Sequence, residues 1–210
     1  MTEGRQYRLL LPVLFITAAA VGIGAKYQPR IDPSDFQSQI SNPYFPLVPG
    51  TRYKYVETVF GETFNREITV TSETKTIMGV KCVSVHDVLT NKGEVREDTY
   101  DWYAQDKKGA VWYFGEATIE IKPGRRRSSA GSWEAGVGGA LPGIVMPAKA
   151  KACEPYQQEY YPNWAEDPSR PEHLPTAFAP GNGRCWNPVP RKGGTRHRLA
   201  SSDQRRLARL

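Results

Sequence analysis

The side chains of this sequence that could act as acids, bases or nucleophiles are mostly carboxyl groups gathered in one stretch. They lie at Glu97, Asp98, Asp101, Asp106 and Glu116. Two carboxyl groups hydrolyse a glycosidic bond when they stand roughly 5 Å or roughly 6.5–9.5 Å apart. Asp101 and Glu116 fall on segments that we expect to pair as strands, so they are the candidate pair. Asp98 and Asp106 are better explained as turn caps, and Glu97 as a charge at a strand edge.

The other common catalytic motifs are absent from the sequence. It contains no G-x-S-x-G, and Ser84 and His86 alternate along one strand rather than forming a triad. Cys82 stands in a similar relation to His86, and a buried strand cysteine is usually inert. The glycine-rich stretch from Gly131 to Gly143 lacks the phosphate-loop pattern. With no C-x-x-C and no EF-hand spacing, we predict no metal site and no cofactor.

The carboxyl pair depends on a β-hairpin. Thr99 to Ala104 and Val111 to Phe114 are rich in aromatic residues, which suit a pleated, half-buried surface. Between them, Asp106-Lys107-Lys108-Gly109 suits a type I turn followed by a bulge at the glycine. On this register we expect Trp102 and Trp112 to approach each other across the strand ladder.

Further strands surround the hairpin. Alternating apolar and polar residues predict them at Arg52 to Val59, Phe64 to Thr71, Thr74 to Met78, Val80 to Val88, Glu94 to Tyr103 and Tyr156 to Trp164. Short turns between consecutive strands are typical of an antiparallel meander. We therefore predict a mainly β fold, an antiparallel meander forming a curved sheet or half-barrel. Ahead of it, a proline-rich arm is expected to tuck Tyr44, Phe45 and Leu47 against the sheet.

The aromatic residues suggest a use other than catalysis. A curved sheet with rings on its concave face holds a lipid, a glycan or a peptide. The candidate ligand-binding residues are Tyr53, Tyr55, Trp102, Trp112, Tyr113 and Trp133. The alternative is that these rings simply form the core.

The chain divides into four predicted parts. Residues 1–25 carry Arg5 and Arg8 before an apolar run and read as a signal peptide or a membrane anchor. Residues 26–41 are a polar linker, 42–167 the β domain and 168–210 a disordered basic tail. We expect an exported protein, periplasmic or extracellular, which contacts a membrane only through its N-terminal segment.

The tail differs in composition from the rest of the chain. Residues 168–210 hold nine Lys or Arg against two Asp or Glu, while the whole chain is +6. Three hypotheses stand: a disordered tail, an arm that binds anionic polymers, or a segment read out of frame in its gene. We do not expect nucleic acid as the partner of the β domain.

Three phrases together indicate a family. The sequence runs NPYFPLVPGT from Asn42, TYDWYAQD from Thr99 and VWYFGE from Val111. It resembles an uncharacterised family of exported bacterial β-rich proteins over about residues 31–167. Family members continue with further strands where this chain enters its basic tail, and the family implies no activity and no catalytic residues. Our leading interpretation is therefore a non-enzymatic binding or scaffold protein of the cell envelope. The alternatives are a secreted hydrolase using Asp101 and Glu116, and a tail that binds anionic polymers.

Overall fold

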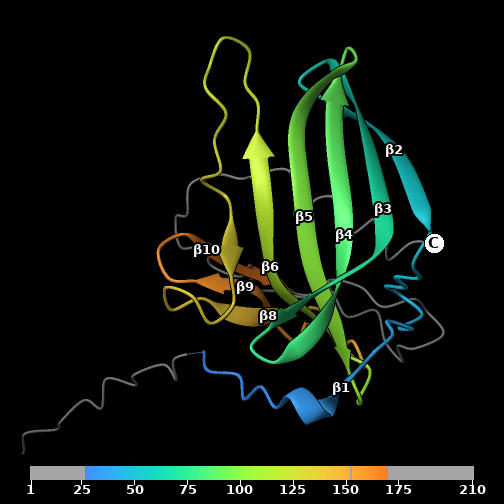
Figure 1. Cartoon of the computed structure of the whole chain (residues 1–210), viewed down its shortest axis with the longest axis vertical. Helices are drawn as coiled ribbons and strands as arrows, with labels where there is room; N and C mark the ends of the chain where they lie inside the picture. The colour runs from blue at the N-terminus through green and yellow to red at the C-terminus, as the bar shows by residue number, and fades with distance from the viewer. Residues whose placement is uncertain (1–26, 152, 170–210) are drawn as a thin grey trace, which may run out of the picture.

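The computed structural model describes residues 27–151 and 153–169, and within them the chain is almost entirely β (Figure 1). One 3-10 turn, η1 (Pro33–Asp35), precedes ten strands. The strands are β1 (Phe36–Gln37), β2 (Arg52–Val59), β3 (Glu62–Ile77), β4 (Val80–Asn91), β5 (Glu94–Asp106), β6 (Val111–Glu120), β7 (Trp133–Glu134), β8 (Leu141–Met146), β9 (Tyr156–Tyr161) and β10 (Ala165–Ser169).

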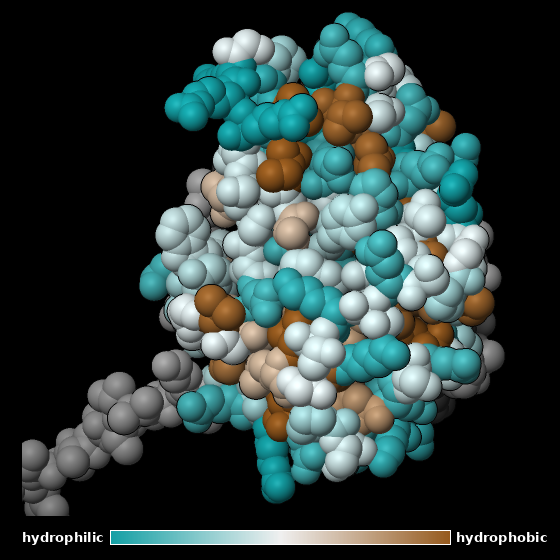
Figure 2. All heavy atoms as spheres, viewed as in Figure 1, coloured by the Kyte–Doolittle hydropathy of each residue, from teal (hydrophilic) through white to brown (hydrophobic). Residues whose placement is uncertain are grey.

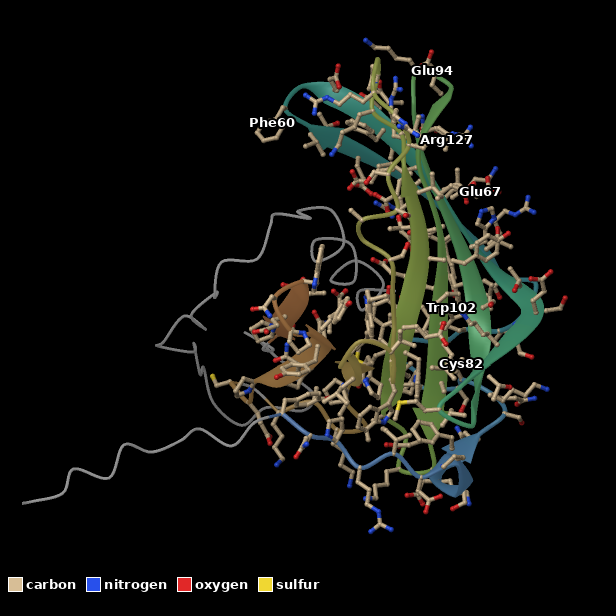
Figure 3. All side chains as sticks on the ribbon, turned by 60° about the vertical axis from the view of Figure 1, so that its left-hand side comes forward. Phe60, Glu67, Cys82, Glu94, Trp102 and Arg127 are labelled. Atoms are coloured by element: carbon tan, nitrogen blue, oxygen red, sulfur yellow. The ribbon has the colours of Figure 1, made fainter. Side chains whose placement is uncertain are left out.

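The strands form one antiparallel sheet that curls into a half-barrel, which confirms the predicted fold class. Eight strands follow the order β10-β9-β8-β6-β5-β4-β3-β2, while β1 pairs with the end of β5 and β7 with β6. The long strands β3 to β6 make a tall curved wall. β8, β9 and β10 fold across the lower part of its concave side, so that β9 faces the wall (Figures 1 and 3).

Strand alternation gives the wall an inner face, which lines the half-barrel, and an outer face. On β3, Arg66, Ile68 and Val70 are buried, while the residues between them are more exposed. These side chains point inward because successive residues of a strand face opposite sides. In the register of the sheet, Ile68 lies opposite Asp87, so the buried inner face includes charged residues.

The lower half of the outer face is covered as well. Pro33 of η1 packs against Gly79, and Met78 packs against Gly136 in the loop after β7. As a result β4 is buried on both sides near its start, where Cys82 and Val83 are both nearly inaccessible. A strand covered on both faces reads as a continuous apolar run rather than an alternating one.

The hairpin between β5 and β6 has the predicted turn. Asp106 Oδ1 accepts hydrogen bonds from the backbone N–H groups of Lys108 and Ala110, each at 2.9 Å. Gly109 adopts a φ of 101°, the left-handed region that its position required. Asp106 Oδ2 also accepts a hydrogen bond of 2.9 Å from Trp112 Nε1. Asp106 therefore caps a turn, as predicted.

The expected Trp102–Trp112 pairing is wrong in its register. Trp102 lies opposite Gly115 and Trp112 lies opposite Ala104, because the β5–β6 register shifts after Trp102. Trp112 instead meets the ring of Phe36, with centroids 6.2 Å apart.

The segment before β2 packs against the sheet. Phe45 and Leu47 are buried, and the Phe45 ring meets Tyr103 at 5.4 Å. Tyr44, expected to tuck in with them, lies at the surface instead, because it sits in a turn that Asn42 closes by accepting hydrogen bonds from the Tyr44 and Phe45 backbone N–H groups. Within the segment predicted as a linker, Ile40 belongs to the core.

Some predictions concern residues outside the described ranges. The signal or anchor at 1–25 and all but the first two residues of the tail at 168–210 lie there. In the part of the chain that the structure describes, no helix is long and apolar enough to cross a membrane.

Replacing Asp106 with alanine tests the turn. Asp106→Ala removes the acceptor of three hydrogen bonds, and we expect the free energy of unfolding to fall by about 2–3 kcal/mol. Urea denaturation followed by tryptophan fluorescence measures the change. Lys108→Ala, in the same turn, is the matched control and should cost less than about 0.5 kcal/mol. Equal stability of the two variants would show that the Asp106 contacts do not hold the hairpin.

Candidate functional site

The sheet register brings the predicted carboxyl pair together. Asp101 on β5 lies directly opposite Glu116 on β6, and Val85 on β4 lies opposite Asp101. Residues directly opposite each other on paired strands project to the same side. Asp101 and Glu116 thus share the inner face of the half-barrel, and they lie on paired strands, as predicted.

A partly open cavity of about 80 Å³ lies against this pair, and we call it the acidic chamber. The sheet contributes Asp87, Glu97, Asp101 and Glu116 to its wall, and β9 contributes Glu159 from across the half-barrel. Aromatic and aliphatic groups complete the lining, among them Phe45, Leu47, Tyr53, Tyr103 and Tyr113.

One tyrosine connects the two predicted carboxyls. Tyr113 Oη lies 2.6 Å from Asp101 Oδ1 and 3.0 Å from Glu116 Oε2. A phenol carries a single proton, so it can donate to only one of these oxygens. Both contacts are hydrogen bonds only when one of the two carboxyls is itself protonated and donates to the tyrosine. Both short contacts are satisfied when one of the two carboxyls holds a proton.

Burial favours the protonated forms. It raises the pKa of Glu116 to about 8, with repulsion from Glu159 adding to the shift. It raises the pKa of Glu159 to about 8, with repulsion from Asp167 and then Asp101 adding to the shift. Burial and then Glu116 also raise the pKa of Asp101. Glu116 and Glu159 therefore hold protons near neutral pH, because ionising all three groups would place like charges in a medium of low polarity.

A buried arginine occupies the other part of the chamber. Arg66 Nε lies 3.1 Å from Glu57 Oε1, and Arg66 Nη1 lies 2.5 Å from Asp87 Oδ2. Burial raises the pKa of Asp87 to about 6 although the attraction of Arg66 opposes the shift. Asp87 Oδ1 is buried and accepts no hydrogen bond from a described residue. Such an oxygen is costly to bury unless something pairs with it.

The six predicted ligand-binding aromatics do not share one face. Tyr53 and Tyr113 line the chamber, and Tyr55 packs at the edge of the core. Trp102 follows Asp101 on the strand and so faces outward, where Lys75 Nζ lies 3.6 Å from its ring centroid. Trp133 lies opposite Glu116 and its ring meets Tyr113 edge-on at 5.2 Å, so it packs on the inner side of the sheet, whereas Trp112 packs beside the hairpin turn.

The exposed apolar groups in view do not form a binding face in place of the predicted aromatic one. In Figure 2 the hydrophobic atoms form small groups among hydrophilic ones over the side of the molecule in view. The most exposed large apolar residue is Phe60, at the tip of the β2–β3 hairpin, far from Trp102 and Cys82 in the lower half of the wall (Figure 3).

The remaining sequence candidates have structural roles. His86 Nε2 lies 2.8 Å from Asp98 Oδ1, and the His86 ring stacks on Tyr100 on the outer face. Asp98, predicted to cap a turn, instead lies within β5. Burial raises the pKa of the Cys82 thiol, so the thiol is neutral. No group of three metal-binding side chains arranged for a metal ion occurs within the described residues.

Sequence reasoning missed Arg66, Asp87 and Glu159. Arg66 lies between Phe64 and Ile68 in the series of every second residue of β3, so the strand pattern could have predicted that it faces inward. Asp87 likewise alternates with Val83 and Val85. No local sequence pattern indicated that Glu159 faces the chamber, because the direction of its side chain depends on how β9 folds across the wall.

Comparison with protein-family models, with curated proteins and with solved structures finds no match to this chain. The resemblance to the exported β-rich family therefore stays a prediction.

The raised pKa values predict how stability depends on pH. The folded-state pKa of Glu116 and Glu159 is about 8, above the ordinary value of 4.5. Between these values the folded state binds more protons than the unfolded chain, so stability is greatest at low pH and falls as pH rises toward 8. Each such proton contributes a slope of up to about 1.4 kcal/mol per pH unit.

Urea unfolding between pH 5 and pH 8 measures this slope. Glu159→Gln should flatten the fall and be more stable than the native chain at pH 8. The matched control is Glu154→Gln, whose carboxyl is 59% exposed beside Lys151 and should leave the slope unchanged. A native slope that is zero or rises over this interval would refute the assignment.

Proposed function

We propose that this protein is a binding protein whose acidic chamber holds a small polar ligand. The chamber is enclosed by the wall on one side and by β9 and the arm at Phe45 on the other. Enclosed sites with a few convergent polar groups are where proteins usually bind small molecules. At about 80 Å³ the chamber suits a small molecule or the polar end of a larger one rather than a whole lipid chain.

The observation that carries this proposal is the set of unpaired oxygens. Among the described residues, Asp101 receives its only side-chain hydrogen bond from Tyr113, through Oδ1, and Asp87 Oδ1 receives none. Both residues line the chamber. A ligand that donates hydrogen bonds to these oxygens would offset the free energy spent in burying them.

The N-terminal residues supply the proposed location. An apolar run after Arg5 and Arg8 supports export, so we place this binding protein in the cell envelope. The tail as a binder of anionic polymers remains a separate prediction, because the structure describes only residues 168 and 169 of it.

A thermal-shift screen of small polar molecules tests the binding proposal. We expect at least one compound to raise the melting temperature of the native chain. Asp101→Asn should lose most of that shift, because an amide replaces one acceptor oxygen with an N–H donor. Asp98→Asn makes the same chemical change on the outer face and should retain the shift. A broad screen without a hit that depends on Asp101 counts against the proposal.

A secreted hydrolase is the second candidate, and the Tyr113 contacts favour it. Both carboxyls lie within hydrogen-bond distance of one oxygen, which is compatible with the shorter of the two spacings used by glycosidases. One protonated and one ionised carboxyl would supply an acid and a nucleophile. The hydroxyl that joins them would have to yield its place to substrate, which makes this the second choice.

Turnover of a panel of chromogenic glycosides tests this candidate. If the pair is catalytic, Asp101→Asn and Glu116→Gln should each lower the rate by about 100-fold or more. Asp98→Asn should leave the rate unchanged. Turnover that survives both chamber substitutions would exclude the pair as the catalytic groups.

A further inference from the structure

We infer that the acidic chamber recognises a small organic cation, a primary ammonium or a comparable nitrogen cation with N–H donors. The inference rests on the proposed binding function and names the chemical class of the ligand. It follows from the charge of the lining, from the unpaired oxygens and from the aromatic wall.

The charges of the lining do not balance. Five carboxyl residues line the chamber, at Asp87, Glu97, Asp101, Glu116 and Glu159, against one cation, Arg66. Arg66 is already committed, since it forms ion pairs with Asp87 and with Glu57. Among the described residues, Asp101, Glu116 and Glu159 form no salt bridge with a basic side chain. An anionic ligand would add to their repulsion, whereas a cation would relieve it.

The shape of the chamber points to the same class. Asp101 is 9% exposed, lines the chamber and has one oxygen without a hydrogen-bond partner among the described residues. Beside it the rings of Tyr103 and Tyr113 stack with centroids 4.9 Å apart, and Phe45 meets Tyr103 edge-on. Ammonium groups bind where carboxylate oxygens and aromatic faces converge, because both present negative potential.

The cation is organic rather than a metal ion. The described carboxyls are not arranged as a metal-coordinating group of three or more ligands. The chamber, at about 80 Å³, is roomier than a bare ion requires. A short alkylammonium fills this volume and places its N–H groups within hydrogen-bond distance of the oxygens.

Binding of a cation is expected to displace protons. Burial raises the pKa of both Glu116 and Glu159 to about 8. Near neutral pH the carboxyls that would pair with the cation are therefore protonated. Other titratable or charged groups also line the chamber: Tyr53, Arg66, Asp87, Glu97, Asp101, Tyr103 and Tyr113. Asp167 of β10 adds its repulsion to Glu159. The affinity for a cation should therefore rise with pH up to about 8, because fewer protons remain to be displaced.

Titration of the full chain with n-butylammonium chloride and with 1-butanol tests the inference, because the two probes share the alkyl chain and differ in charge. Isothermal titration calorimetry at pH 6 and pH 8 should show n-butylammonium binding at least about tenfold more tightly at pH 8. Runs in two buffers of different ionisation enthalpy should show proton release on binding. 1-Butanol should not bind measurably at either pH.

Asp101→Asn should lower the affinity for n-butylammonium about tenfold, which corresponds to one lost charge contact. Asp98→Asn should leave this affinity unchanged. Glu159→Gln is the second variant, should Asp101→Asn fail to fold by circular dichroism. Equal binding of 1-butanol, or binding of n-butylammonium without proton release, overturns the cation inference. A neutral polyol that binds in an Asp101-dependent way overturns it too, yet leaves the binding proposal standing. No binding by any compound, charged or neutral, overturns both.

Discussion

Repulsion among buried carboxyl groups is the constraint on which this structure depends. Asp101, Glu116 and Glu159 come from three strands and face one chamber, where burial strengthens the repulsion between their charges. The fold meets this constraint with protons and with the hydroxyl of Tyr113, which joins two of the groups. Because protons neutralise these carboxyl groups at the place where a ligand could bind, a cationic ligand could take the place of the protons.

The half-barrel creates this situation through simple strand geometry. Alternation along β5 directs Asp101 inward and Trp102 outward, and pairing with β6 places Glu116 beside Asp101. The curl of the sheet then lets β9 bring Glu159 across the concave side. The 3-10 turn η1 and the loop after β7 cover the lower outer face, and the apolar residues buried there stabilise the wall. The inner face can therefore carry polar groups.

The sequence pattern predicted much of the strand arrangement. The alternation from Arg52 onward and the turn at Asp106 predicted the strands and the hairpin, and the hairpin put Asp101 and Glu116 on neighbouring strands. The register shift after Trp102 was not predictable, because a β-bulge depends on how neighbouring strands twist. Nor was the position of Glu159, since the return of β9 over the wall is a long-range contact without a local signal.

The most direct test of the account is a carbon-13 NMR titration of the side-chain carboxyl groups, with the chamber resonances assigned through Glu116→Gln and Glu159→Gln. The account predicts that both groups titrate with midpoints near 8 in the ligand-free protein. Midpoints near the ordinary value of 4.5 would show that water reaches these carboxyls freely and that the acidic chamber does not exist as described.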